Sequence, residues 1–173
     1  MTKRKNFLDK IKTLDELDAL IKALRSAGKI VAGVTSGAYD IVHSGHSLFL
    51  QKAADECDFL IVIIASDRTV TEDKGPRKPY VTEVRRAEVV ASIESVDAVI
   101  ISDEKYHETI LQLLKADKMF KGGEYREQTI YGSELVGEMV FIEGREEEFH
   151  SSDIAHRIRT GDWRVPRLDQ PAR

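Results

Sequence analysis

The sequence predicts an α/β fold, a single domain built on an open parallel sheet with helices on both faces. Short apolar runs, such as the segment 59–65, alternate along the chain with longer segments whose apolar residues recur at helical spacing. The runs are apolar at every position rather than at alternate positions, which is typical of strands buried on both faces. The length of 173 residues fits one domain with a substantial core.

Strands and helices follow one another from residue 13 onward. Thr13 and Glu16 have the spacing of a capping box, which predicts a first helix that ends at Gly28 in the left-handed conformation. The pattern predicts strands over 29–35, 58–66, 97–101, 117–120 and 138–143, and further helices over 47–57, 83–95, 106–116 and 151–161. This alternation is that of a Rossmann-like sheet.

The segments between these elements are polar. Thr82 is placed to cap the helix that follows it, and 67–81, which holds two of the four prolines, is predicted to be a loop. Further loops are predicted over 121–129 and 144–150, with a weakly helical stretch over 131–137.

Composition argues against several classes of protein. The net charge of −4 disfavours a nucleic-acid-binding protein, although a local pocket on an acidic protein can still be positive. Cys57, the single cysteine, leaves no intramolecular disulfide framework and fits a reducing compartment. The N-terminus has no apolar signal region, and the longest apolar run is too short to span a bilayer. We therefore expect a soluble, cytoplasmic protein that binds neither nucleic acid nor membrane.

Two of the five histidines, His43 and His46, stand at the junction of the first predicted strand and the helix after it. In open α/β sheets, ligands bind beyond the carboxyl ends of the strands. Gly45 leaves room for a phosphate to approach the backbone, and the helix N-terminus offers N–H donors and the positive end of its dipole. The junction therefore predicts a phosphate site in which the imidazoles donate hydrogen bonds to phosphate oxygens.

The segment G-A-Y-D-I-V-H-S-G-H, residues 37–46, resembles the G-x-F-D-x-x-H-x-G-H signature of the nucleotidyltransferase superfamily that includes cytidylyltransferases and ADP-heptose synthase. The resemblance implies attack by a substrate phosphate on the α-phosphorus of a nucleoside triphosphate, with release of pyrophosphate and no covalent bond to the protein. It implies ATP or CTP as co-substrate, with Mg²⁺ held mainly by phosphate oxygens and water because the sequence shows no carboxylate cage. A homodimer is also a family expectation.

Other segments match the family in the same order along the chain. The lysine of D-K-G-P-R-K-P matches the family lysine that reaches the triphosphate, and K-G-G-E-Y, from residue 121, resembles the K-G-G-D-Y segment near the base in heptose-phosphate adenylyltransferases. R-E-E-E-F-H-S-S-D-I, from residue 145, is similar to the R-T-E-G-I-S-T-T-D-L motif that holds the β- and γ-phosphates. The resemblance implies catalytic roles for His43, His46, Lys74 and Arg145. It implies nucleotide-binding roles for Ser36, Gly37, Ala38, Tyr39, Asp40, Gly45, Arg86, Lys121, Gly122, Gly123, Glu124, Ser151 and Ser152.

The similarity covers roughly residues 13 to 160 and includes the first helix, which looks like the start of the ADP-heptose synthase domain. It implies an N-terminal extension over 1–12, a nucleotidyltransferase domain over 13–160 and a C-terminal tail over 161–173.

The family pattern is broken at a few positions, where Ser36, Ala38 and Tyr39 replace asparagine, cysteine and phenylalanine, and Glu148 and His150 replace small residues. The favoured function is transfer of a nucleotidyl group from ATP to a sugar 1-phosphate such as heptose 1-phosphate. The alternatives are a CTP-dependent cytidylyltransferase for a polyol or amino-alcohol phosphate, an FMN adenylyltransferase, and a nucleotide-binding regulatory module that has lost turnover.

Overall fold

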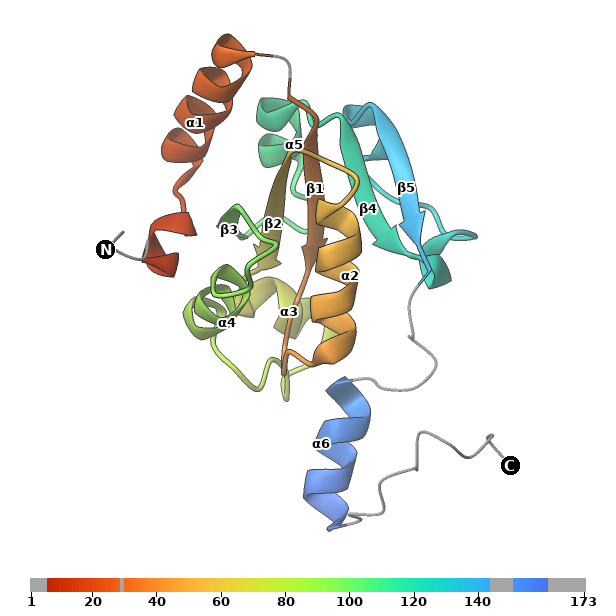
Figure 1. Ribbon diagram of the computed structural model, residues 1–173. Coiled ribbons are helices and arrows are strands. Elements are labelled where there is room, and N and C mark those ends of the chain that lie inside the picture. Colours follow the sequence, from red (N-terminus) through yellow and green to blue (C-terminus); the bar gives the residue numbers. More distant parts are fainter. Residues whose placement is uncertain (1–5, 29, 144–150, 162–173) are drawn as a thin grey trace.

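The computed structural model describes residues 6–28, 30–143 and 151–161 (Figure 1). Within these ranges, one sheet contains five parallel strands in the order β3-β2-β1-β4-β5. The strands are β1 (Ala32–Gly37), β2 (Phe59–Ala65), β3 (Ala98–Ser102), β4 (Lys118–Gly122) and β5 (Glu138–Ile142). The helices are α1 (Leu14–Ala27), α2 (Ser44–Ala54), α3 (Asp67–Lys74), α4 (Glu83–Ala91), α5 (Glu108–Leu114) and α6 (Ser151–Thr160), with 3₁₀ turns η1 (Phe7–Lys10), η2 (Gly123–Tyr125) and η3 (Ser133–Leu135).

The strand order reverses between β1 and β4. From β1 the chain adds β2 and then β3 on one side, and it crosses back to place β4 and β5 on the other side. Thr35 of β1 pairs in register with Phe120 of β4, so these two strands end close together. Because the loops after β1 and β4 lead in opposite directions, this position is the topological switch point at which open α/β sheets form their ligand crevice.

Helices cover both faces of the sheet, and successive residues of β2 supply both cores (Figure 1). Leu60 packs with Leu50 of α2 and Val90 of α4 on one face. On the other face, Ile61 belongs to a cluster with Leu17 of α1 and residues of α5. Successive residues of β2 therefore enter opposite layers, and this two-sided burial explains why β2 is apolar throughout. The predicted open parallel sheet with helices on both faces is confirmed.

Local signals place most elements correctly. The capping box that begins α1 is present, since Thr13 N–H donates to Glu16 Oε2 at 2.8 Å and Glu16 N–H donates to Thr13 Oγ1 at 3.3 Å. The predicted left-handed end at Gly28 is wrong, because its φ of 166° is extended backbone. Thr82 does occupy the N-cap position of α4, but its side chain makes no capping hydrogen bond there.

The segment 67–81, predicted as a loop, contains the helix α3. Ser66 caps this helix, because its Oγ accepts from Thr69 N–H at 3.2 Å, and Thr69 and Val70 are buried. The other residues of α3 are largely polar, so the segment lacks the apolar stripe on which the prediction relied. The predicted loop over 144–150 lies outside the described residues. In the described part of the chain, no helix is long and apolar enough to cross a membrane.

Candidate active site

The two histidines of the strand-to-helix junction hold each other and the start of α2. His43 is the N-cap residue, and its Nδ1 accepts a hydrogen bond from Gly45 N–H at 3.2 Å. His46, one turn later, accepts from His43 N–H through its own Nδ1, also at 3.2 Å. The ring centroids are 4.0 Å apart. This reciprocal arrangement fixes both imidazoles at the N-terminal end of the helix, where the dipole is positive.

The environment of His46 favours its neutral form. Burial, together with the nearby His43 and Lys74, lowers the pKa of His46 to about 4. Because Nδ1 of each ring accepts from a backbone amide, the proton of a neutral imidazole resides on Nε2. At neutral pH, His46 is therefore an uncharged donor whose Nε2–H can be offered to an oxyanion.

The segment 39–41, which lies just before the histidine pair in the chain, packs against it through Tyr39. Tyr39 is buried, and its ring centroid lies 5.4 Å from that of His46. Burial raises the pKa of the Tyr39 phenol. Tyr39 and Ile41 both adopt left-handed backbone angles, with φ of 51° and 55°. Such conformations in non-glycine residues concentrate at functional sites, where the surrounding structure holds them in place.

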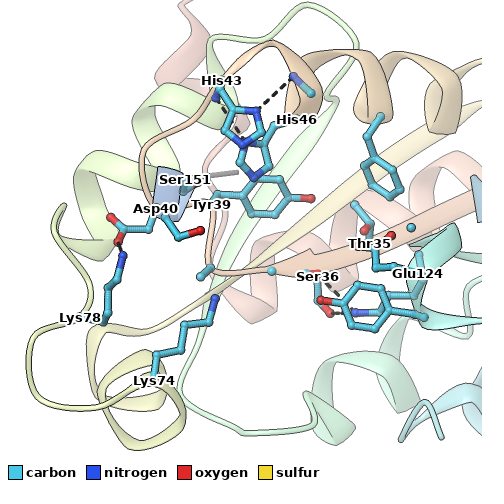
Figure 2. Close-up of a pocket in the computed structure, with 18 residues that line it drawn as sticks. Thr35, Ser36, Tyr39, Asp40, His43, His46, Lys74, Lys78, Glu124 and Ser151 are labelled. Atoms are coloured by element: carbon cyan, nitrogen blue, oxygen red, sulfur yellow. Dashed lines mark hydrogen bonds and ion pairs between the residues drawn. The ribbon is translucent and has the colours of Figure 1, made fainter. Parts of the chain in front are cut away.

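A cavity of about 490 Å³ opens in front of the histidines, at the switch point between β1 and β4. This volume falls in the range of roughly 300–1,000 Å³ that is usual for small-molecule sites. Figure 2 shows His43, His46, Lys74 and Lys78 toward one end of the cavity, and Ser36 and Glu124 toward the other. The cavity therefore has a cationic end next to the helix N-terminus and a mixed polar end at β4.

The polar end is organised by Lys121. Its Nζ donates to Ser36 Oγ at 3.0 Å and to the Ser36 carbonyl at 3.3 Å, which ties the end of β4 to the end of β1. Burial lowers the pKa of Lys121, and the neighbouring Glu124 carboxylate opposes that shift. The carboxylate of Glu124 lies over the Cα of Gly122, in the space that a side chain at residue 122 would fill.

Helix α6 begins at the same cavity although it lies more than a hundred residues after β1. Ser151 Oγ donates to the Ile41 carbonyl at 3.2 Å, and Ser151 and Ser152 both line the cavity. The N-terminal ends of α2 and α6 thus meet around one space, and each helix contributes the positive end of its dipole.

Most residues proposed from the sequence come together here. Those that line the cavity are Ser36, Gly37, Ala38, Tyr39, Asp40, His43, Gly45, His46, Lys74, Lys121, Gly122, Glu124, Ser151 and Ser152. Gly123 lies instead beside the Glu143 carboxylate, and the guanidinium of Arg86 is buried beneath the site, where it donates to backbone carbonyls. Arg145 lies outside the described residues, as do Glu148 and His150.

Sequence reasoning did not select four residues that line the cavity, namely Thr35, Phe49, Lys78 and Tyr125. Phe49 follows His46 by three residues, so helical spacing could have placed it on the same face of α2. Lys78 belongs to the basic segment around Lys74, and Tyr125 ends the K-G-G-E-Y segment. Both residues could therefore have been selected from segments that the family resemblance already singled out.

Comparison with known proteins agrees with this geometry. The model of the cytidylyltransferase-like family matches residues 34–164, which include the histidine junction, β4 and the start of α6. The chain belongs to the cytidylyltransferase-like family. The resemblance found in the signature segment is thereby confirmed.

Curated relatives of this family member carry the name bifunctional protein HldE. The relative from Geotalea uraniireducens (strain Rf4) is 35% identical over 159 residues, which are 88% of this chain and 31% of that protein. The relative from Campylobacter jejuni subsp. jejuni serotype O:2 (strain ATCC 700819 / NCTC 11168) is 38% identical over 157 residues, which are 91% of this chain and 33% of that protein. The chain spans about a third of the length of the curated relatives that it matches.

Solved structures share the fold. A lipopolysaccharide core biosynthesis protein from Thermoplasma volcanium GSS1 superposes with a TM-score of 0.57 and 22% identity, over 66% of this chain and 97% of that one. A pantoate-beta-alanine ligase from Francisella tularensis superposes with a TM-score of 0.53 and 15% identity, over 84% of this chain and 75% of that one. At these identities the likeness concerns the fold alone.

Proposed function

We propose that this chain is a nucleotidyltransferase that transfers the nucleotidyl group of ATP to a sugar 1-phosphate such as heptose 1-phosphate and releases pyrophosphate. The observation that carries the proposal is the reciprocal His43–His46 pair, which places two imidazoles at a helix N-terminus inside a cavity with a cationic end. Family membership and the relatives named bifunctional protein HldE support the same reaction class.

The reaction forms a bond between an acceptor phosphate oxygen and the α-phosphorus, and it breaks the bond from that phosphorus to the pyrophosphate oxygen. Negative charge on the phosphate oxygens redistributes as the pyrophosphate departs, so preorganised donors lower the barrier. His43 and His46 supply such donors through their Nε2–H groups. Because the pKa of His46 is about 4, this residue donates without first losing or gaining a proton near pH 7.

The cations and the start of α6 are the groups that hold the triphosphate. Lys74, in the last turn of α3, and Lys78, in the loop after it, both line the cavity near the histidines. Ser151 and Ser152 sit in the first turn of α6, where hydroxyls and backbone amides suit terminal phosphates. We propose Arg145, from the same motif, as a further triphosphate contact.

The opposite end of the cavity is proposed to receive the base and ribose. Gly122 and Glu124 lie there with Tyr125, whose ring faces the Lys121 ammonium at 5.8 Å. A carboxylate accepts hydrogen bonds, so it suits the exocyclic amine of adenine or cytosine. The preference for ATP and for a heptose phosphate is supported by the K-G-G-E-Y segment and by the relatives.

Mg²⁺ is proposed to enter with the triphosphate. Within the described residues, no group of three His, Cys, Asp or Glu side chains is placed to hold a metal ion by itself. The cavity carboxylates are Asp40 and Glu124, and Asp40 is already engaged by backbone amides. These residues fit an ion that is bound mainly by phosphate oxygens and water, and that neutralises charge on the phosphates. A homodimer in the cytoplasm completes the proposal, and sedimentation would test the oligomeric state.

The experiment is pyrophosphate release from ATP and from CTP, each with Mg²⁺ and a panel of heptose 1-phosphate, glycerol 3-phosphate, phosphocholine and FMN. We expect release from ATP with the heptose phosphate and only background release with the other acceptors. Release from CTP with an alcohol phosphate would instead make the chain a cytidylyltransferase. ATP binding without release from any combination would contradict the proposed activity and favour a regulatory nucleotide-binding module.

A further inference from the structure

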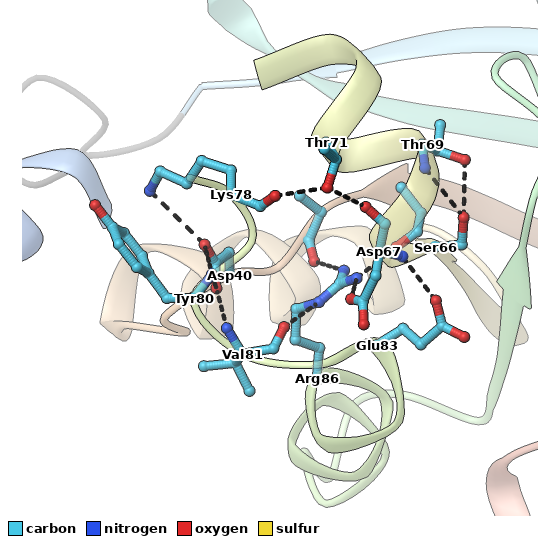
Figure 3. Close-up of polar contacts among 12 residues, drawn as sticks. Asp40, Ser66, Asp67, Thr69, Thr71, Lys78, Tyr80, Val81, Glu83 and Arg86 are labelled. Atoms are coloured by element: carbon cyan, nitrogen blue, oxygen red, sulfur yellow. Dashed lines mark hydrogen bonds and ion pairs between the residues drawn. The ribbon is translucent and has the colours of Figure 1, made fainter. Parts of the chain in front are cut away.

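Among the residues that the structure describes, Arg86 is the largest fully buried side chain, and it does not line the cavity. Its guanidinium donates to the carbonyls of Ala38, Ala65 and Val81, at 2.8 Å for Ala65 and 2.9 Å for Val81. It also pairs with Asp67 Oδ1 at 2.9 Å. Ala38 directly follows β1, Ala65 ends β2, Asp67 begins α3, and Val81 lies in the loop before α4. One side chain therefore joins three separate segments of the chain (Figure 3).

Asp40, expected from the signature to contact the nucleotide, is also engaged inside the protein. It is 7% exposed, and its carboxylate accepts from Tyr80 N–H at 2.9 Å and from Val81 N–H at 3.0 Å (Figure 3). A carboxylate that accepts two backbone amides makes charge-assisted hydrogen bonds, which are stronger than neutral ones. Asp40 therefore fastens the loop before α4 to the segment that leads into the histidine pair.

Val81 is held from both sides by these two residues. Its N–H donates to Asp40 and its carbonyl accepts from Arg86. We call Asp40, Arg86 and the backbone of Val81 the clasp. Because the clasp acts on main-chain groups, it holds the backbone at Tyr80 and Val81 between Asp40 and Arg86.

The loop that the clasp holds lies next to two cations of the phosphate end of the cavity: Lys78 is part of the loop, and Lys74 directly precedes it. Lys74 ends α3, and Lys78 lines the cavity with its Nζ at 3.7 Å from Asp40 Oδ2 and 3.7 Å above the Tyr80 ring. The distance of 3.7 Å exceeds that of a normal hydrogen bond. Asp40 keeps its two amide donors without Lys78, so Lys78 can turn to a phosphate while the loop stays fastened.

We propose that Asp40 and Arg86 are positioning residues, whose clasp on Val81 holds Lys74 and Lys78 at the phosphate end of the cavity. The inference rests on the proposed function in that the anion held there is a nucleoside triphosphate. On this inference, both residues act by holding the loop in place. The family resemblance had instead implied that they contact the nucleotide directly.

The variant Asp40→Asn separates this positioning role from simple electrostatics, because the two accounts predict opposite changes in the affinity for an anion. Removing a negative charge beside the cavity should by itself tighten binding of an anion. Loosening the clasp should weaken binding of the anion. The apparent dissociation constant equals the intrinsic one divided by the fraction of molecules whose loop keeps the binding-competent conformation. If about a tenth of the Asp40→Asn molecules keep the binding-competent loop conformation, the dissociation constants for ATP and inorganic triphosphate should rise about tenfold. Both constants are measured by calorimetry.

Asp73→Asn is the matched control, because Asp73 is exposed on α3 next to Lys74 and loses the same charge without touching Val81. It should leave triphosphate binding unchanged or slightly tighter. Unchanged or tighter binding in a folded Asp40→Asn variant would overturn the clasp. Arg86→Lys keeps the charge but loses the spread of donors, so it should weaken binding in the same direction as Asp40→Asn.

Amide hydrogen exchange tests the clasp without depending on the function or on any variant. In the unmodified protein, the Tyr80 and Val81 amides should exchange slowly, and in Asp40→Asn they should exchange faster while core amides keep their protection. Unprotected Tyr80 and Val81 amides in the unmodified protein would overturn the proposal even if the variants failed to fold. Failure of the unmodified protein to bind ATP or triphosphate would instead count against the proposed function, and the exchange result would still decide whether the clasp exists.

Discussion

Replacing Gly45 by alanine should separate the catalytic use of His43 from the stability of the fold. A Cβ at residue 45 would lie 3.0 Å from both Cε1 and Nδ1 of His43, so the imidazole must give by a few tenths of an ångström. A misplacement of about 1 Å at a reacting centre costs about a hundredfold in rate, so we expect kcat to fall about three- to tenfold. The same displacement strains the hydrogen bond from Gly45 N–H to His43 Nδ1.

Stability should change little, because two effects oppose each other. Alanine is favoured over glycine inside a helix by about 1 kcal/mol. Losing the hydrogen bond between Gly45 and His43 costs about 1 kcal/mol. For a protein of this size, the midpoint of thermal unfolding should therefore stay within about 4 °C.

The assay is steady-state pyrophosphate release alongside thermal unfolding, with Gly28→Ala as the control. A Cβ at Gly28 meets no atom within 4 Å, and its φ of 166° suits any residue, so this variant should keep full activity. If Gly45→Ala kept the kcat of the unmodified protein, the position of the His43 ring would not matter, and our account of the pair would be refuted. A large loss of stability with unchanged kcat would have the same meaning.

Two further predictions concern protonation. His46 should titrate near pH 4 by NMR rather than near pH 6.5, and Lys74→Met should move that midpoint upward because the Lys74 charge helps to lower the pKa. A midpoint near 6.5 in the unmodified protein would contradict the half-buried, neutral donor. His46 and His107 both have pKa values of about 4 in the folded protein. Between pH 6.5 and 5 the unfolded chain therefore binds more protons than the folded protein does, so the free energy of unfolding falls as the pH falls. The slope is about 1.4 kcal/mol per pH unit for each fully titrating histidine. His107→Asn should reduce this slope in urea unfolding at pH 7, 6 and 5, since asparagine tolerates the left-handed backbone at residue 107, and an unchanged slope would contradict the assignment.

The parts of the fold that could be predicted from sequence are those governed by neighbours in the chain. The capping box of Thr13 and Glu16 and the apolar strands are local signals, and both were confirmed. The junction of His43 and His46 could be recognised because its geometry depends on four consecutive residues at the start of one helix. The segments that match the family gave most of the remaining cavity lining but not Thr35, Phe49, Lys78 and Tyr125. Periodicity alone cannot bring together residues that are far apart in the chain.

The roles of Asp40 and Arg86 could not be predicted from local patterns. Most of their hydrogen-bond partners are main-chain groups, up to 48 residues away. Backbone carbonyls and amides leave no trace in the amino-acid types. Helix α3 escaped prediction for a related reason, since Ser66, Thr69 and Val70 stabilise it by a cap and tertiary burial rather than by an apolar stripe. The wrong expectation at Gly28 shows that a glycine after a helix permits a left-handed residue without requiring it.

The most direct test of the central claim is the kcat of His46→Ala for pyrophosphate release, measured beside His156→Ala. His156 is exposed on α6 and does not line the cavity, so it controls for the loss of an imidazole. Loss of the bond from His43 N–H to His46 Nδ1 should cost about 1 kcal/mol of stability and leave the fold intact. We predict that kcat falls about a hundredfold or more in His46→Ala and is unchanged in His156→Ala. A folded His46→Ala variant with near-normal kcat would contradict the claim that the histidine pair stabilises the departing pyrophosphate.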